Sequence, residues 1–193
     1  MVQHDVRSGM SLSDFIAQYS RQPFELHNGG ESIDLSPNIS GHQWVARTLF
    51  RLFEQFFRAN PIAEVIWETP FVLTDQADWV KGSRTPDLAL YLAHRWAEYV
   101  AKVPDWKQKP IIMVPDLVVE VVSPTDHYSD INNKVEGYLS DGVQIVWVID
   151  PQCCKVAIHR ADSDQQTTLR ESGALTGEDL LPGFSVSVRT LFV

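Results

Sequence analysis

The sequence predicts an α/β fold, and two observations carry this prediction. The first is a strand–helix–strand unit, with an apolar strand at residues 117–122, a helix at residues 128–140 and a second apolar strand that begins near residue 144. Continuous apolar runs indicate strands buried on both faces, and a helix between two of them favours a right-handed crossover within one sheet. The second observation is a long amphipathic helix at residues 42–59. Its apolar stripe consists of Val45, Leu49, Leu52, Phe53 and Phe56.

Two short elements precede the long helix. Ser11 and Asp14 form an S-x-x-D pattern, which predicts the start of a helix that extends to Tyr19. Residues 24–36 contain two short extended pieces on either side of an Asn-Gly-Gly turn sequence. This arrangement predicts a β-hairpin.

The middle of the chain supplies further strands. Residues 63–74 alternate in polarity on either side of Pro70 and are expected to form a strand. Residues 84–92 are expected to form another strand, which the chain enters through Pro86. Residues 93–109 are polar with scattered aromatic residues, and they fit either a helix or a lid.

The C-terminal half completes the predicted sheet. Gly142 is expected to end the helix at residues 128–140, because glycine is the usual residue just past a helix C-terminus. After a turn at Pro151, the strand at residues 154–160 is expected to pair with the strand before it. The apolar side of the predicted helix consists of Ile131, Val135, Tyr138 and Leu139.

Size and charge set limits on the class of protein. The chain has 193 residues, of which 44% are hydrophobic, and we expect a single domain over residues 1–193. The net charge of −9 argues against a protein that coats nucleic acid nonspecifically. It leaves open contact with DNA over one local patch, and it suits an acidic site whose charge is offset by a bound cation.

The sequence also indicates a location. No apolar run is long enough to span a bilayer, and the N-terminus lacks the apolar core of a signal peptide, so we expect a cytoplasmic protein with no membrane partner. Cys153 and Cys154 are adjacent, and adjacent cysteines rarely bond each other. Their spacing does not fit a zinc site, so both are expected to be structural thiols.

Glu120 stands in the middle of the apolar strand at residues 117–122, where a carboxylate is costly unless it is paired or coordinates a cation. Asp87 likewise lies on an apolar strand just after a proline, and Lys134 lies on the helix that follows the Glu120 strand. If the two strands pair, Asp87 and Glu120 lie side by side. A helix packed on the sheet could then direct Lys134 toward them.

Two neighbouring carboxylates and a lysine suit the hydrolysis of phosphodiester bonds. Carboxylates a few ångströms apart repel unless a cation lies between them. Mg²⁺ takes oxygen ligands from one or two carboxylates plus substrate phosphate, polarises the phosphoryl oxygen and activates a water molecule. A lysine can stabilise the charge that develops in the transition state.

The motifs around these residues resemble a known family. TPDLAL, PDLVVEVVSPTD and NNKVEGYLSDGVQIVWVIDP are similar to the Uma-two family of putative restriction endonucleases, which belongs to the PD-(D/E)XK nuclease superfamily. The resemblance extends over nearly the whole chain, through SLSDFIAQ, FELHNGGE, SPNISGHQWVARTLFRLF and LLPGFSVSV. It implies a restriction-endonuclease-like mixed central sheet flanked by helices, with an αβββαβ core and an N-terminal helix and hairpin addition.

The resemblance also implies roles for particular residues. Asp87 would be the aspartate of the PD half of the motif and Glu120 the acid of the (D/E)XK half, with the backbone carbonyl of Val121 near the metal. This sequence departs from the superfamily motif at Val122, which stands where the lysine is expected. The lysine of this family is displaced onto the following helix, where it corresponds to Lys134.

Two further positions match the family near its site. Glu31 in the hairpin and His42 at the start of the long helix would have secondary catalytic roles. The resemblance implies a DNA endonuclease that uses Mg²⁺ or Mn²⁺. A homodimer is also expected, because nucleases that cut both strands often act as dimers and the apolar edges of this chain permit one.

Each candidate residue also has a structural explanation. Asp87 could be a turn or cap residue, and His42 could stabilise a helix terminus. Asp116 lies four residues before Glu120 and could be the site acid, although its position at the strand entrance favours a turn role. Lys134 could be a solvated residue paired with Asp130 one turn earlier.

Aromatic residues suggest base stacking at first, but packing in the core or in a dimer interface is the favoured explanation for most of them. Trp44 and Trp147 lie in strongly patterned segments and are expected to be buried or half-buried. The other aromatic residues considered are Trp67, Trp79, Tyr91, Trp96 and Trp106.

Three functions follow from these observations. The first is a metal-dependent DNA endonuclease. The second is a module for binding or assembly that keeps the nuclease fold without catalysis, a hypothesis motivated by the acidic net charge and by Val122. The third is a metal-dependent hydrolase of a smaller phosphate ester.

Overall fold

The computed structural model describes residues 8–27, 30–32, 40–76 and 78–193. Contacts divide the chain into two compact units, each assembled from three separate stretches. The first unit comprises Met1–Leu35, Pro70–Thr85 and Asp105–Val114, and the second comprises Ser36–Thr69, Pro86–Pro104 and Pro115–Val193. Because the stretches alternate along the chain, no single linker separates the units. The single domain expected over residues 1–193 stays a prediction.

The described part of the first unit contains a five-stranded sheet, one α-helix and one short 3₁₀ helix, η1 (Trp106–Gln108). The strands follow the order β1-β6-β2-β3, and β5 pairs with β6. The elements are β1 (Met10–Ser11), α1 (Leu12–Tyr19), β2 (Glu25–His27), β3 (Gly30–Ser32), β5 (Phe71–Gln76) and β6 (Trp79–Arg84). Its core consists of Leu12, Phe15, Phe24, Leu26, Val72 and Val80.

Both predictions for the N-terminal segment are confirmed over the described residues. The Ser11 hydroxyl accepts a hydrogen bond from the backbone N–H of Asp14 at 3.1 Å and caps α1. β2 and β3 pair antiparallel as a hairpin. Residues 28–29 of the predicted turn, and residues 33–36, lie outside the described residues.

The single strand predicted for residues 63–74 is wrong. β4 (Ala63–Trp67) and β5 are separate strands of different sheets, with Pro70 between them. A proline lacks the N–H that a continuous ladder needs, so the chain leaves one sheet before it enters the other. The sequence also gave no indication of β6, since WVKGSR lacks a regular alternation.

The second unit is built on a six-stranded mixed sheet in the order β11-β10-β9-β8-β7-β4. β8 and β9 are parallel, and the other neighbours are antiparallel. The remaining strands of this sheet are β7 (Leu88–Leu92), β8 (Leu117–Val121), β9 (Ile145–Asp150), β10 (Lys155–Arg160) and β11 (Ser163–Arg170). The sequence predicted β7 to β10, and the parallel β8–β9 pair agrees with the predicted crossover, whose handedness stays a prediction.

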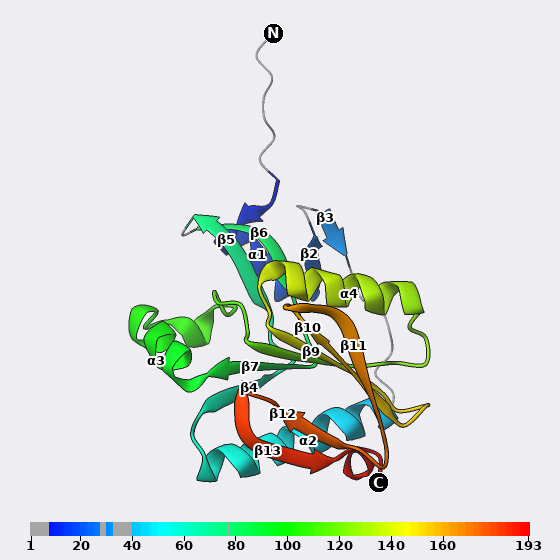
Figure 1. Cartoon of the computed structure of the whole chain (residues 1–193). Helices are drawn as coiled ribbons and strands as arrows, with labels where there is room; N and C mark the ends of the chain where they lie inside the picture. The colour runs from blue at the N-terminus through cyan, green and yellow to red at the C-terminus, as the bar shows by residue number, and fades with distance from the viewer. Residues whose placement is uncertain (1–7, 28–29, 33–39, 77) are drawn as a thin grey trace. The chain divides into compact units, whose positions relative to one another are not determined.

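Helices cover both faces of this sheet (Figure 1). α2 (Ser40–Ala59) lies on one face together with β12 (Ala174–Gly177) and β13 (Leu181–Ser187), and α4 (Tyr128–Asp141) lies on the other. The rings of Phe53 and Trp147 stack with centroids 5.8 Å apart, and Phe184 completes the cluster at 4.7 Å from Phe53. The order α2, β4, β7, β8, α4, β9 is the expected αβββαβ core.

Two segments that were predicted as helical can be compared with the structure. The predicted helix at residues 128–140 is confirmed as α4, and Gly142 ends it with a left-handed φ of 105°. Residues 93–109 form a helix, α3 (Ala93–Lys102), followed by the short 3₁₀ helix η1 (Trp106–Gln108). A second 3₁₀ helix, η2 (Val188–Leu191), lies near the C-terminus.

The aromatic residues are mostly used in packing, as the sequence predicted. Trp147 and Tyr91 are completely buried. Trp44 was expected to be buried or half-buried, and half of its surface is buried, with 50% exposed. The buried side of α2 is formed by its neighbours in the predicted stripe, so Trp44 faces outward, where the Arg47 guanidinium lies 5.8 Å from its ring.

Two further observations concern the whole described chain. No described helix is long and apolar enough to cross a membrane. Cys153 and Cys154 are free thiols, and Cys153 is exposed.

Candidate active site

Glu120 lies on β8, and Asp87 directly precedes β7, the neighbouring strand, so the pairing that the sequence left open does bring the two acids together. β7 and β8 pair antiparallel, with Leu88 opposite Val119. One step further in the same register, Asp87 lies opposite Glu120. Val119 belongs to the core beneath α2, so alternation along β8 directs Glu120 to the other face, toward α4.

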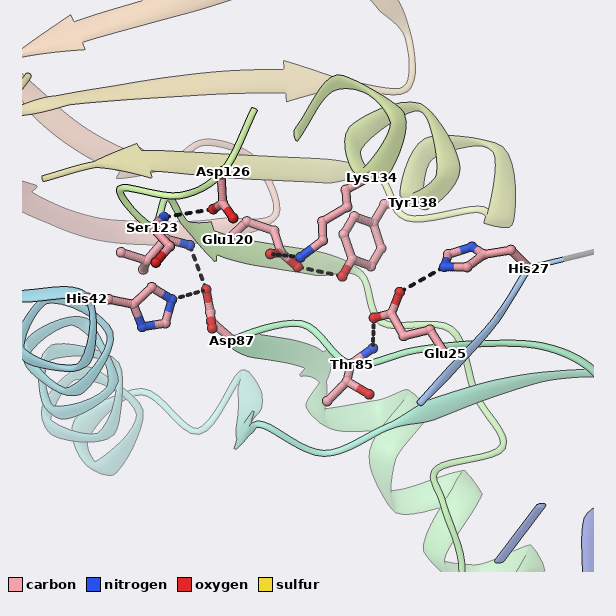
Figure 2. Close-up of polar contacts among 11 residues, drawn as sticks. Glu25, His27, His42, Thr85, Asp87, Glu120, Ser123, Asp126, Lys134 and Tyr138 are labelled. Atoms are coloured by element: carbon pink, nitrogen blue, oxygen red, sulfur yellow. Dashed lines mark hydrogen bonds and ion pairs between the residues drawn. The ribbon is translucent and has the colours of Figure 1, made fainter. Parts of the chain in front are cut away.

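Glu120 is buried, at 5% exposure, and accepts hydrogen bonds from two residues of α4. The Tyr138 hydroxyl donates to Oε1 at 2.5 Å, and the Lys134 ammonium lies 3.4 Å from Oε2 (Figure 2). Lys134 and Tyr138 are four residues apart, so both point from one face of α4. Both groups donate, so the two oxygens of this buried carboxylate are held by residues of one helix.

Asp87 is held at the start of β7 by its own set of donors. Its Oδ2 accepts the backbone N–H of Val121 at 2.6 Å and lies 3.2 Å from Nε2 of His42 (Figure 2). Its backbone carbonyl accepts the N–H of Glu68 at 3.1 Å. The carboxylate side chain is 14% exposed, so it remains accessible to a small ligand.

His42 is buried at the N-terminal end of α2. Burial alone would lower the pKa of His42, but the hydrogen bond to Asp87 and the charges of Asp87, Glu120 and Glu68 outweigh it, so the pKa is raised. Within the described chain, Nδ1 of His42 is buried without a hydrogen-bond partner. The acidic neighbours of His42 therefore favour the protonated form of its imidazole, whose Nε2 faces Asp87.

Glu68 is a neighbour of the site that the sequence did not indicate. It follows β4 with a φ of 42°, and its carboxylate accepts a hydrogen bond from the Gln43 amide at 2.9 Å. β4 pairs with β7, with Trp67 opposite Leu88, so the same register puts Glu68 opposite Asp87. Nothing in the run AEVIWETP distinguishes this glutamate from a surface residue.

Asp116 lies before the other end of β8 and is almost completely buried, at 2% exposure. Its carboxylate accepts the Leu92 N–H at 2.9 Å, an Arg95 guanidinium N–H at 2.6 Å and the Gln144 amide at 3.0 Å. Three donors from three different segments fix this end of the sheet. This geometry favours the predicted role at the strand entrance over a role as the site acid.

The structure thus brings together most of the predicted residues. Asp87, Glu120, Lys134 and His42 form one cluster, to which Val121 contributes its N–H. Glu31 lies in β3 of the first unit with an exposed side chain, and its secondary role stays a prediction. Tyr138 was assigned only to the apolar side of its helix. Its spacing of four residues from Lys134 is the signal that could have identified its contact with Glu120.

The donor set fits a hard divalent cation. Two carboxylates on adjacent strands, with the backbone of Val121 beside them, offer the oxygen ligands that Mg²⁺ prefers, and Mg²⁺ needs only one or two carboxylates from the protein. Within the residues described, no group of three or more His, Cys, Asp and Glu side chains could hold a metal ion. A cation at this site would therefore take its other ligands from backbone, water or substrate.

A trough adjoins the site on the α4 side of the sheet. It has a volume of about 380 Å³ and lies between the first turns of α4 and strands β9 to β11. Val148 in this trough pairs directly with Glu120 of β8. The trough therefore begins one strand away from the buried acid.

Comparisons with known proteins agree with this geometry. The model of the family Uma2, described as "Putative restriction endonuclease", matches residues 12–189. The chain belongs to this family. Membership of Uma2 confirms the resemblance and supports a nuclease-like function.

A solved structure is similar to this Uma2 chain. It is the crystal structure of a putative nuclease belonging to DUF820 from Anabaena variabilis ATCC 29413. The two share 16% sequence identity with a TM-score of 0.74, over 95% of this chain and 97% of the other. At this identity the likeness shows the shared fold alone. No curated protein matches the chain.

Proposed function

We propose that the protein is a metal-dependent DNA endonuclease. One observation carries this proposal: the Asp87 carboxylate accepts the N–H of Val121, the residue after Glu120, and Lys134 reaches Glu120 from the helix that follows. Family membership supports it, since the Uma2 model is described as "Putative restriction endonuclease" and a restriction endonuclease acts on DNA.

The residues have separate roles in the proposed reaction. Asp87 and Glu120, with the Val121 carbonyl, would hold a divalent cation, Mg²⁺ or Mn²⁺. When bound, such a cation polarises the phosphoryl oxygen and lowers the pKa of a water molecule. Lys134 would stabilise the negative charge that develops on the phosphate in the transition state.

The lysine position is the main departure from the superfamily motif. Val122 stands at the usual lysine position, and Lys134 would replace that lysine from α4. Its ammonium lies 3.4 Å from Oε2 of Glu120, which is close enough for Lys134 to take the place of the lysine that is missing at position 122. Tyr138 holds the other carboxylate oxygen, so that Glu120 keeps one orientation.

The test is cleavage of plasmid DNA. Purified protein is expected to nick or cut the plasmid with Mg²⁺ or Mn²⁺ and to lose this activity when the cation is chelated. Glu120→Ala should abolish cleavage, whereas Glu136→Ala, which changes an exposed glutamate of α4, should leave it unchanged. Equal cleavage by Glu120→Ala, or no cleavage of any DNA form with any divalent cation, would refute the proposal.

A second candidate is a binding or assembly module without catalysis, which the valine at position 122 favours. Calorimetric titration with Mg²⁺ or Mn²⁺ separates the two. Binding that Asp87→Ala abolishes supports the enzyme, and no binding at millimolar cation supports the inactive module. The cytoplasmic location and the homodimer expected from the sequence stay predictions.

A further inference from the structure

The trough beside Glu120 contains residues that lie in one row with Glu120 across the paired strands of the sheet. Glu120 pairs with Val148, Val148 with Ala157, and Ala157 with Thr168, across four adjacent strands. Neighbouring strands are about 4.8 Å apart, so this row extends roughly 14 Å from the acid. A phosphate at Glu120 would therefore leave the base of the same or the adjoining nucleotide over the trough.

The floor of the trough is small and apolar. Val148 of β9 and Ala157 of β10 line it together with Val122, which directly follows β8, and alternation directs their side chains to the face that α4 covers only in part. Because the floor is the surface of a sheet and Ala157 is small, it accommodates a flat apolar ring better than a branched or spherical group.

The rim carries groups that donate and accept hydrogen bonds. Asn132 of α4 stands on one side, and Gln166 and Thr168 of β11 stand on the other. The ladder of β10 and β11 has a bulge between Ser163 and Thr167, and bulges commonly redirect side chains beside binding sites. Amides and hydroxyls match the mixed donors and acceptors on the edge of a nucleobase.

The charges of the trough favour an uncharged ligand. Asp126 accepts the N–H of Ser123 at 2.7 Å, and Asp150 accepts those of Gln152 and Cys153 and lies 3.5 Å from Lys155. These two carboxylates would repel a phosphate, and the lysine is engaged with one of them. Burial lowers the pKa of His159, which leaves a neutral imidazole in the lining at neutral pH.

Tyr128 provides a surface for stacking. It is the first residue of α4, lines the trough and is 80% exposed, the most exposed of the large hydrophobic side chains in the described chain. A ring exposed at the edge of a cavity with an apolar floor can stack on a base from above.

We propose that this trough binds an unpaired nucleobase of the DNA strand whose phosphate lies at Glu120. The inference rests on the proposed nuclease function and narrows its substrate class to DNA with single-stranded or extruded nucleotides. A fully paired duplex keeps its bases stacked and cannot fill the trough without the cost of unpairing.

The test measures binding separately from cleavage. Fluorescence anisotropy with chelator present compares three labelled DNAs: a single strand, the paired duplex of the same sequence, and the same single strand with abasic sites in place of its bases. The wild-type protein is expected to bind the single strand more tightly than the other two. Tyr128→Ala should weaken single-strand binding roughly tenfold or more, and Tyr128→Phe, which keeps the ring, should not.

A second variant fills the trough from below. Ala157→Leu is expected to weaken single-strand binding while circular dichroism shows an unchanged fold. Binding of the single strand that neither Tyr128→Ala nor Ala157→Leu weakens would overturn the inference, and so would the absence of any single-strand binding. Cleavage is measured in a separate assay. If the protein binds the single strand through the trough but cleaves no DNA, only the proposed nuclease function is refuted. If Tyr128→Ala and the wild type cleave duplex DNA equally well, only the proposed binding of a base in the trough is refuted.

Discussion

The hydroxyl of Tyr138 donates a hydrogen bond to Oε1 of Glu120 at 2.5 Å, and both side chains are buried. A short contact to a buried carboxylate restricts the rotation of that carboxylate. Glu120 therefore presents a fixed face to any cation that binds beside Asp87. Tyr138 acts through Glu120 and is a positioning residue in the proposed reaction.

Replacing Tyr138 with phenylalanine tests this positioning. Tyr138→Phe removes one donor from a buried acceptor, which costs about 1–3 kcal/mol of the free energy of unfolding. We expect kcat for DNA cleavage to fall about tenfold with little change in KM, because Glu120 becomes less well oriented. Urea denaturation and steady-state cleavage measure the two effects. Tyr128→Phe, whose ring is mostly exposed, should change neither, and an unchanged kcat in Tyr138→Phe would exclude the positioning role.

Lys134 is expected to contribute charge to the transition state. Lys134→Met keeps the length of the side chain but removes the ammonium, and we expect kcat to fall roughly a hundredfold or more. Lys134→Arg should recover part of the rate, since it restores the charge with a different geometry. Plasmid nicking under saturating cation measures the rates. If Lys134→Met cleaves at the wild-type rate, the lysine only balances the charge of Glu120.

Asp116 and Asp87 are expected to behave in opposite ways. Asp116→Asn disturbs a buried carboxylate with three donors, so the free energy of unfolding should fall by about 3 kcal/mol. Its cleavage rate per folded molecule should change little. Asp87→Asn should abolish cleavage with a smaller loss of stability, since its side chain is more exposed (14%, against 3% for Asp116). The reverse pattern would identify Asp116 as the site acid.

The sequence predicted the elements that carry the proposed chemistry. The apolar strands β8 and β9 and the helix between them have strong periodicity, and an acid inside such a strand is conspicuous because burial of a charge is costly. The residues alone left the pairing of the two acidic strands open, and the family resemblance then assigned roles to Asp87, Glu120 and the displaced Lys134.

Other features depend on tertiary contacts and left no local signal. Glu68 follows β4, and Gln43 lies near the start of α2. Their hydrogen bond depends on how these two elements are placed in the fold, and no short sequence pattern predicts it. Tyr138 counts as apolar when the periodicity of its helix is considered, although its hydroxyl donates the hydrogen bond that holds Glu120. The prediction of one strand over residues 63–74 was wrong because the alternation of polar and apolar residues continues across Pro70, although the chain passes there from one sheet to another.

A pH-dependent ion pair lies at the far end of β10. The Arg160 guanidinium donates two hydrogen bonds to the carboxylate of Glu178, one of them from Nε at 2.8 Å. The hydrogen bond to Arg160 lowers the pKa of Glu178, and the charge of Arg160 adds to the effect against the opposing influence of burial. Glu178 therefore stabilises the fold above its unfolded-state pKa, and this contribution is lost as the pH falls through the lower folded-state pKa.

Glu178→Gln is expected to lower the free energy of unfolding by about 0.5–1 kcal/mol at neutral pH, a modest value because the pair is partly exposed to solvent. The difference from wild type should shrink as the pH falls below about 4, where the wild-type carboxylate also becomes neutral. Urea denaturation across this range measures both values. Asp179→Asn, at the exposed neighbouring residue, should show no such dependence. A difference that persists unchanged in acid would mean that the substitution acts through packing rather than charge.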